Sequence, residues 1–355
     1  GRTPGPGERW TFPEQADTLE AIADSRGTSF YRGNLAGKIA EHAAASGAAM
    51  TREDLAAHES DWVEPLTIDY HGARLHEIPP NGQGIAALIM LGILRHHPVA
   101  DLHPDCPDAL HLQIEAMKLA FRDAKRYVAD PGWMDIDPRQ LLDDAYLESR
   151  AARIDPRHAR DFDHGIPHGG GTVLLTTADR HGMMVSFIQS NYMGFGSGVV
   201  IPGTGIAMQN RGAGFVLDDG HPNRVAGGKR PYHTIIPGLV TWPDHPDRGA
   251  LAFGVMGGHM QPQGHAQVLV RMVDFGQNPQ AALDAPRFRV EDGLVVKIEP
   301  GFAPDTYDAL RERGHDLRIA DERTVHYGGA QAILELEHGY CGASDLRRDG
   351  QAVGW

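Results

Sequence analysis

Thr172 stands directly behind three glycines, in the run His168-Gly-Gly-Gly-Thr172, and opens the apolar stretch 172–178. β-Branched and aliphatic residues in such a stretch predict a buried strand. A threonine at the head of this strand can become a new N-terminus, because its hydroxyl can attack the carbonyl of Gly171. Its freed α-amine would then act as the base for that hydroxyl. The same residues also fit an ordinary loop that enters an ordinary strand.

A threonine nucleophile needs an orienting partner and donors for the oxyanion. Ser190 can orient it from the strand that is expected after the turn at 179–182. Gly257 and Gly258, in the run 254–259, offer two backbone N–H groups that no side chain covers. This glycine pair suits an oxyanion hole, and it equally suits a plain tight turn.

Other chemical motifs are weaker. Six metal-ligating side chains crowd one short stretch after a predicted helix: His96, His97, Asp101, His103, Asp105 and Cys106. Their spacing matches no standard structural zinc site, and we interpret the stretch as a solvated loop. The sequence holds no HExxH, no phosphate-binding glycine loop and no GxSxG motif. We therefore expect neither a metal nor a cofactor.

Composition bounds the class of protein. With 355 residues, 41% of them apolar and 23% charged, the chain is globular and can form one large or two medium domains. The net charge of −14 argues against nucleic acids and anionic membranes as partners. The longest apolar run, 85–94, is too short to span a membrane, and residues 1–10 lack the features of a signal peptide.

The elements that must position these residues change character along the chain. Helices are expected at 17–47, with breaks at Gly27 and Gly33, at 83–96 and at 108–129, and Thr51–Asp54 has capping-box spacing. The polar stretch 151–171 predicts a loop or a processing linker. Later helices are expected at 261–274 and 304–313. Strands are expected at the C-terminus and at 66–70, 74–78, 172–178, 183–189, 204–209, 234–241, 250–255, 287–290, 294–298 and 330–336.

The chain resembles the γ-glutamyltranspeptidase family of N-terminal-nucleophile hydrolases. The motifs that carry the resemblance follow the family's order and spacing over nearly the whole chain: Gly171-Thr172, Phe195–Val200, Pro202–Ile206, Gly228–Pro231 and Met256–Gly258, preceded by a helix over 108–133. The resemblance implies an α+β fold, a four-layer αββα sandwich, cleaved between Gly171 and Thr172. Residues 1–171 would be the C-terminal portion of a large subunit, whose N-terminal part lies outside this chain, and residues 172–355 the catalytic small subunit.

The same resemblance assigns roles to the residues. Thr172 is the expected nucleophile for self-cleavage and for acyl transfer. Ser190 stands where the family has a second threonine that hydrogen-bonds the first. Gly257 and Gly258 stand at the oxyanion positions.

Departures from the family concern the substrate. Gln209-Asn-Arg-Gly-Ala-Gly-Phe215 replaces the family's acidic run, so that Arg211 and Gly214 stand where acidic residues grip an α-amino group. Because an arginine favours a carboxylate, we expect a carboxylate-binding pocket, and the pattern is similar to the oxamate amidohydrolase-like branch. A surface or structural ion pair is the alternative for Arg211. The other expected substrate contacts are Tyr192, Asn210, His233 and Thr234.

These observations favour an autoprocessing amidohydrolase or acyltransferase that acts on a small carboxylate-bearing amide. Two alternatives stay open: a true γ-glutamyl transferase or glutathione hydrolase, and an inert family member that binds a carboxylate or supports an assembly. Beyond the small-molecule substrate, the expected partners are the large and small subunits of one precursor, with a homodimer of these pairs left open. The compartment also stays open, with the cytoplasm favoured.

Overall fold

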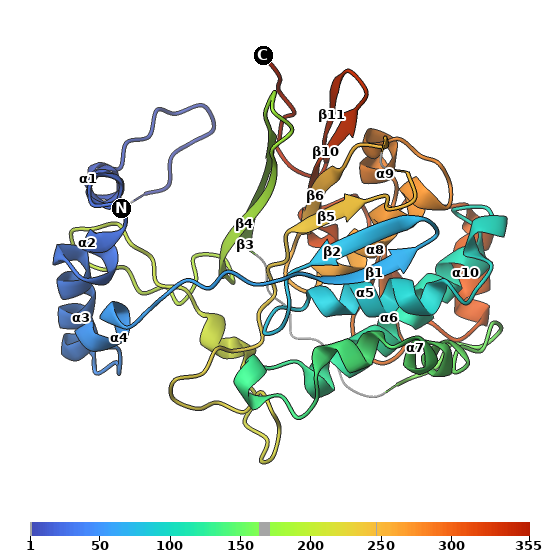
Figure 1. Ribbon diagram of the computed structural model, residues 1–355, viewed down its shortest axis with the longest axis horizontal. Coiled ribbons are helices and arrows are strands. Elements are labelled where there is room, and N and C mark those ends of the chain that lie inside the picture. The colour runs from blue at the N-terminus through green and yellow to red at the C-terminus, as the bar shows by residue number, and fades with distance from the viewer. Residues whose placement is uncertain (1, 163–170, 246) are drawn as a thin grey trace. The chain divides into compact units, whose positions relative to one another are not determined.

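The computed structural model describes residues 2–162, 171–245 and 247–355 (Figure 1). They form two compact units, one of Gly1–Trp62 with Phe195–Asn210, and one of Val63–Gly194 with Arg211–Trp355. Residues 163–170 of the expected linker 151–171 lie outside the described ranges.

The first unit is helical. Ala36, Ile39, Leu55 and Ile201 form its small core. The capping box at Thr51 is confirmed. Its helices are α1 (Pro13–Asp24), α2 (Thr28–Tyr31), α3 (Asn34–Ser46) and α4 (Arg52–Ala56).

The strand expected at 204–209 in this unit is wrong. The stretch contributes a single bridge between Val200 and Ala207. Gly203 and Gly205 have φ values of 66° and 68°, and this left-handed backbone turns the chain instead of extending it.

The second unit is built on a six-stranded antiparallel sheet in the order β1-β2-β5-β6-β10-β11. The strands are β1 (Leu66–Tyr70), β2 (Ala73–Glu77), β5 (Gly238–Thr241), β6 (Leu251–Met256), β10 (Gly329–Leu336) and β11 (Gly339–Ser344). Every residue of the central strand β6 is buried, because both faces of the sheet are covered there. The sheet contains strands from both sides of residue 171, so the two compact units do not coincide with the expected subunits 1–171 and 172–355. The division into these subunits stays a prediction.

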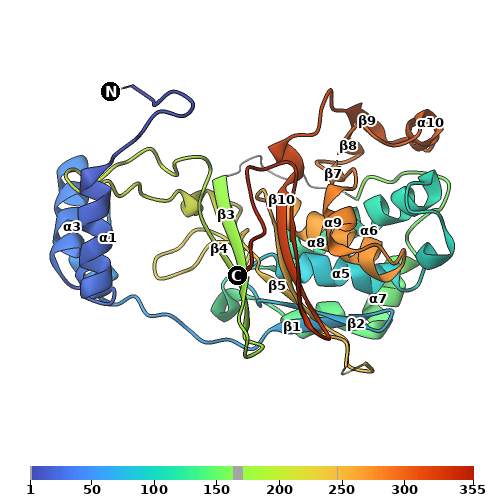
Figure 2. The ribbon, with the colours of Figure 1, turned by 90° about the horizontal axis from the view of Figure 1, so that it is seen from above.

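Helices cover one face of this sheet. α5 and α8 pack together beside it, and α6 lies beyond α5 (Figures 1 and 2). All residues of α5 are buried, since the helix is enclosed by its neighbours and the sheet. The helices are α5 (Gly84–Leu94), α6 (Pro107–Tyr127), α7 (Asp144–Ala151), α8 (Met260–Val273), α9 (Pro279–Asp284) and α10 (Pro304–Glu312).

A two-stranded hairpin covers the other face. β3 (Gly171–Ala178) pairs with β4 (Met184–Tyr192), and Figure 2 shows the hairpin across the sheet from α5 and α8. A third, small sheet joins β7 (Phe288–Val290), β8 (Val295–Ile298) and β9 (Asp316–Ile319). The α+β class, with helices on a sheet that faces a second sheet, is as predicted.

Most expected elements are confirmed to within a few residues. The strand expected at 234–241 is shortened to Gly238–Thr241, and α7, α9 and β9 were not expected. Among the helices within the described ranges, none is long and apolar enough to span a membrane.

Candidate active site

Thr172 and Ser190 lie opposite each other in the β3–β4 hairpin. The Thr172 hydroxyl donates to Ser190 Oγ over 3.1 Å, and the two residues are register partners. The pairing shifts at Gly171/Thr172, so that a bulge separates Thr172 from the residue before it. The local hairpin alone therefore brings the expected nucleophile to its expected partner.

The inner face of the hairpin carries both hydroxyls. Because side chains alternate along a strand, Thr172 shares its face with Leu174, and Ser190 shares its face with Ile188. Leu174 and Ile188 form a buried cluster with Met256 of β6. The face that carries the hydroxyls is therefore the face that packs on the sheet.

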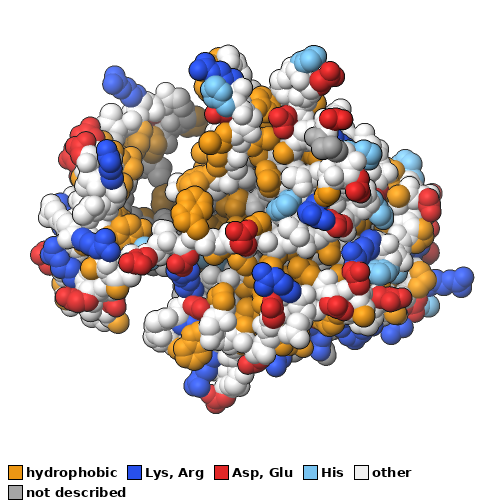
Figure 3. Space-filling view, in the orientation of Figure 1, with side chains coloured by type: hydrophobic (Ala, Val, Ile, Leu, Met, Phe, Trp, Pro, Cys, Tyr) orange, Lys and Arg blue, Asp and Glu red, His pale blue; other side chains and the backbone are white. Residues whose placement is uncertain are grey.

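The outer face of the hairpin is apolar and exposed. Val173, Leu175, Val185 and Phe187 are 61%, 43%, 42% and 46% exposed, and hydrophobic side chains gather over β3 and β4 in Figure 3. The alternation of strand residues thus separates a packed face with the hydroxyls from an exposed apolar face.

The hairpin is oriented so that its Thr172 end points to the Gly257 end of β6. Leu174 packs over Gly254, where an added Cβ would lie 2.9 Å from the leucine methyl. Further along the hairpin, the Ser186 hydroxyl donates to the Phe253 carbonyl over 2.8 Å. Ser186 is the partner of Thr176. The direction from Thr176 to Thr172 along β3 is therefore the direction from Phe253 to Met256 along β6.

Gly257 and Gly258 form a tight turn between β6 and α8. Their φ values are 119° and 61°, which favour glycine. The Gly257 carbonyl accepts from Met260 N over 3.1 Å, and the Gly258 carbonyl accepts from Gln261 N over 3.2 Å. Since C=O and the next N–H point in opposite directions in a trans peptide, the Gly258 N–H points away from the first turn of α8. The positive end of the α8 dipole adds to the field at this turn, which suits an oxyanion.

Arg211 is anchored beside Ser190. Its Nη1 donates to Thr234 Oγ1 over 2.5 Å, and its Nη2 donates to the Ser190 carbonyl over 3.5 Å. The guanidinium lies over the Tyr192 ring, 4.9 Å from the centroid. Arg211 is 5% exposed, so the surface alternative for this residue is wrong, and burial lowers its pKa to about 10.

Tyr192 holds an unusual backbone conformation next to this cation. Its φ is 80°, a value that residues other than glycine rarely adopt. Its N–H donates to Ser190 Oγ over 2.9 Å. Ser190 Oγ therefore accepts from both Thr172 and Tyr192, which holds the serine rotamer in place. Strain of this kind is typical of functional sites.

His233 and Asn210 differ from the other expected contacts. Burial, and next the charge of Arg211, lower the pKa of His233 to about 4, so its ring is neutral near pH 7 and adds no second cation. The structure joins Tyr192, Thr234 and Arg211 directly, whereas Asn210 ends the first compact unit and is not placed relative to them.

Gln83 is a site neighbour that sequence reasoning missed. Its Nε2 donates to the carbonyl of Thr234 over 2.6 Å and to the carbonyl of Gly258 over 2.9 Å. The only signal in the sequence is its place in the turn Pro79-Pro-Asn-Gly-Gln83 before a helix, and such a turn does not indicate what the side chain will meet.

One group of three metal-ligating side chains occurs within the described ranges, formed by His111, Glu115 and His315. His111 Nδ1 lies 2.8 Å from His315 Nε2, and His111 Nε2 lies 2.8 Å from the Asp155 carbonyl. Lys118 Nζ lies 2.7 Å from Glu115 Oε1 and 3.4 Å from His315 Nδ1. These contacts form a continuous chain of hydrogen bonds from the Asp155 carbonyl to the Glu115 carboxylate. We therefore interpret the group as a hydrogen-bonded network and not as a metal site.

The stretch 96–106 contributes no ligand to this group. Cys106 instead caps α6, where its Sγ accepts from Ala109 N over 3.4 Å.

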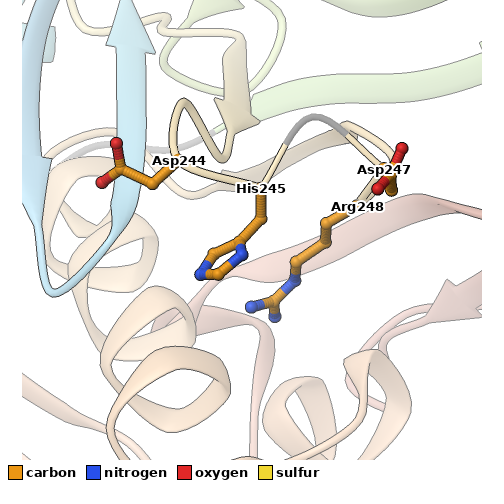
Figure 4. Close-up of a pocket in the computed structure, with 4 residues that line it drawn as sticks. All are labelled: Asp244, His245, Asp247 and Arg248. Carbon is orange, nitrogen blue, oxygen red and sulfur yellow. The ribbon is translucent and has the colours of Figure 1, made fainter.

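A surface hollow lies in the β5–β6 connection, lined by Asp244, His245, Asp247 and Arg248 (Figure 4). It adjoins the Leu251 end of β6, and Gly257 follows the other end of the same strand. A six-residue strand separates the two ends by roughly 17–20 Å. The hollow therefore belongs to a different part of the sheet from Thr172 and Gly258.

The α+β scaffold is that of the N-terminal-nucleophile hydrolases, as predicted, and the solved cephalosporin acylase from Bacillus halodurans shares it. That protein superposes with a TM-score of 0.92 at 50% identity, over 98% of this chain and 63% of its own. The family model for gamma-glutamyltranspeptidase matches residues 1–355, and the chain belongs to that family. The resemblance in the sequence is thus confirmed.

Two curated relatives match the chain from end to end. The glutathione hydrolase-like YwrD proenzyme of Bacillus subtilis is 35% identical over 364 residues, which cover 100% of this chain and 68% of the relative. The oxamate amidohydrolase proenzyme of Klebsiella pneumoniae is 37% identical over 361 residues, which cover 100% and 67%. The chain spans about two thirds of the length of these relatives.

Proposed function

We propose that the protein is an autoprocessing amidohydrolase or acyltransferase with Thr172 as nucleophile and a small carboxylate-bearing amide as substrate. The observation that carries the proposal is the shared position of Ser190. Its hydroxyl accepts from Thr172 over 3.1 Å, and its carbonyl accepts from the buried cation Arg211 over 3.5 Å. A nucleophile and a carboxylate receptor thus meet at one residue.

The first reaction is self-cleavage between Gly171 and Thr172. The Thr172 hydroxyl attacks the Gly171 carbonyl, the C–N bond breaks, and the nitrogen takes up the hydroxyl proton. The broken bond leaves the α-amine of Thr172 free, and water then hydrolyses the resulting ester to the Gly171 carboxylate and the Thr172 hydroxyl. Residues 172–355 become the small subunit in this proposal, and residues 1–171 end the large subunit.

The second reaction is amide hydrolysis. Thr172 Oγ attacks the substrate carbonyl while its proton passes to the α-amine, and the N–H groups of Gly257 and Gly258 bind the oxyanion. The leaving amine takes the proton as the C–N bond breaks. Water, or a second amine in acyl transfer, then attacks the acyl ester and restores the Thr172 hydroxyl.

The substrate class follows from Arg211. A bound carboxylate would offset the burial that lowers the pKa of this guanidinium, whereas an α-ammonium group would meet a cation. The similarity to a relative that is named an oxamate amidohydrolase supports the same class. This charge argument favours carboxylate-bearing amides that lack an α-ammonium group over the γ-glutamyl alternative.

The test compares matched substrates with the processed protein. Oxamate and oxamide have nearly the same shape and differ in one negative charge. We expect hydrolysis of oxamate to exceed that of oxamide, and γ-glutamyl-p-nitroanilide to be a poor substrate. Turnover of γ-glutamyl-p-nitroanilide, which carries an α-ammonium group, as fast as that of oxamate would contradict the proposal. A chain that stays uncleaved and inactive would favour the inert alternative.

A further inference from the structure

The Gln83 side chain uses all four of its hydrogen-bonding positions. Its Nε2 donates to the carbonyls of Thr234 and Gly258 over 2.6 and 2.9 Å. Its Oε1 accepts from Tyr232 Oη over 3.3 Å and from His259 Nδ1 over 3.1 Å. Gln83 is 0% exposed. Carbonyl oxygens only accept hydrogen bonds, so the amide has one orientation here and His259 carries its proton on Nδ1.

The backbone around Gln83 is held against the same segment. Gln83 N donates to the His233 carbonyl over 2.9 Å, and His233 N donates to the Asn81 carbonyl over 2.9 Å. Asn81 Nδ2 donates to the Pro231 carbonyl over 2.6 Å. The turn before α5 is thus hydrogen-bonded to the segment 231–234. These bonds fix the backbone that carries the Gln83 side chain.

The two partners of Gln83 Nε2 belong to two different parts of the site. Thr234 accepts from Arg211 through its hydroxyl, and Gly258 belongs to the turn that offers N–H groups to an oxyanion. We infer that Gln83 is a positioning residue that sets the spacing between Arg211 and the Gly257–Gly258 turn. It thereby selects amides by the number of atoms between their carboxylate and the carbonyl that is attacked. This inference rests on the proposed function.

The physical reason is that one rigid amide joins two backbone segments. Without it, the carbonyl of Thr234, a residue that is 2% exposed, and the carbonyl of Gly258 both lose a buried donor. The Gly258 carbonyl still accepts from Gln261 N, but the amide no longer fixes the distance between the two peptides. A displacement of about 1 Å at a reacting group lowers a rate by up to roughly a hundredfold.

The experiment uses three monoamides whose carboxylate and amide carbons are separated by no, one and two methylene groups: oxamate, malonamate and succinamate. In the processed wild type we expect kcat/KM to differ strongly among them. Gln83→Ala should lower kcat by about ten- to a hundredfold and should reduce the ratio of kcat/KM between the best and worst amide by at least about fivefold. This ratio does not depend on the fraction of active enzyme, so a purely structural loss leaves it unchanged.

Gln113→Ala is the matched control. Gln113 is also a buried glutamine, 4% exposed, but its Nε2 donates to the Ala109 carbonyl within α6. Its replacement should lower the melting temperature without changing the ratio. Gln83→Met keeps the side-chain length and removes every donor, and it serves if Gln83→Ala does not fold. A wild-type ratio in the Gln83 variants would overturn the inference.

A second measurement separates this inference from the proposed function. A wild type that hydrolyses none of the three amides would overturn the proposed function alone. Methylboronic acid, which has no carboxylate, can form a tetrahedral adduct on the Thr172 hydroxyl with an oxygen at the oxyanion position. Calorimetry should show binding about tenfold weaker in Gln83→Ala than in the wild type. Equal affinity would overturn the role of Gln83 at the glycine turn.

Discussion

Arg211 and Ser190 share a hydrogen bond, from the guanidinium Nη2 to the serine carbonyl over 3.5 Å. The cation is thereby tied to the residue whose hydroxyl accepts from Thr172. Arg211 also donates to Thr234 and lies over the ring of Tyr192. Its contacts with Ser190 and Tyr192 therefore couple the position of the guanidinium to the end of β4. Under the proposed function, a change at Ser190 or Arg211 would therefore act on both the nucleophile and the charge that selects the substrate.

Thr172→Ala should abolish self-cleavage, because the alanine has no hydroxyl to attack the Gly171 carbonyl. The measurement is intact mass spectrometry, which should find two fragments of the wild type that divide before Thr172, and one uncleaved chain of the variant. Thr176→Ala is the control, since Thr176 lies in the same strand, opposite Ser186. Cleavage of the Thr172→Ala chain at 171/172 would refute the assignment.

Ser190→Ala should lower kcat by roughly ten- to a hundredfold, because the hydroxyl of Thr172 loses the acceptor that orients it. Ser190→Thr keeps a hydroxyl and should retain most of the activity. Ser186→Ala is the control, since the Ser186 hydroxyl lies in the same strand but donates to the Phe253 carbonyl. Steady-state kinetics on oxamate decide the matter, and an unchanged kcat in Ser190→Ala would exclude the orienting role.

Arg211→Met should weaken transition-state binding of carboxylate amides by about 2 kcal/mol, or roughly thirtyfold in kcat/KM, since a charged hydrogen bond is lost. Hydrolysis of the neutral oxamide should change little. Arg211→Lys keeps the charge but lacks the planar fork, so it should recover part of the loss. The ratio of kcat/KM for oxamate and oxamide is the measurement. Equal losses on both substrates would indicate a structural role for Arg211 instead.

The network around His315 should make the fold sensitive to acid. Burial, and next the charge of Lys118, lower the pKa of His315 to about 2, below its ordinary value of 6.5. The unfolded chain therefore takes up this proton first. The contribution of neutral His315 to the free energy of unfolding is complete above about pH 6.5. It is lost as the pH falls from there toward 2, by about 1.4 kcal/mol per pH unit for one proton.

Thermal unfolding followed by circular dichroism between pH 7 and pH 4 tests this effect. His315→Gln, which does not titrate, should start with a lower melting temperature and depend less on pH than the wild type. His338→Gln replaces a histidine whose side chain is 88% exposed and should leave the wild-type profile unchanged. Parallel profiles for the wild type and His315→Gln would show that His315 is not the titrating group.

Local patterns predicted much of the scaffold. The capping box at Thr51, the buried helix that begins at Gly84 and the hairpin that pairs Thr172 with Ser190, 18 positions apart, each depend on residues within one short segment. The strand that was wrongly predicted also depended on a local pattern. The strand expected at 204–209 has apolar residues in a suitable pattern, but the positive φ values of Gly203 and Gly205 turn the chain there.

The sequence by itself determined the pairing of Thr172 with Ser190, the glycine turn at 257–258 and the replacement of the family's acidic residues by Arg211 and Gly214. Short-range periodicity and turn chemistry are sufficient to place the hairpin and the glycine turn, whereas the roles of Ser190, Arg211 and Gly214 follow from the resemblance to the family. Only the tertiary structure decided that Arg211 is buried against Ser190, and that Gln83 donates to Gly258, a residue 175 positions away. These contacts arise when the hairpin and α5 pack on opposite faces of one sheet, and no pattern within a single segment encodes which side chains then meet.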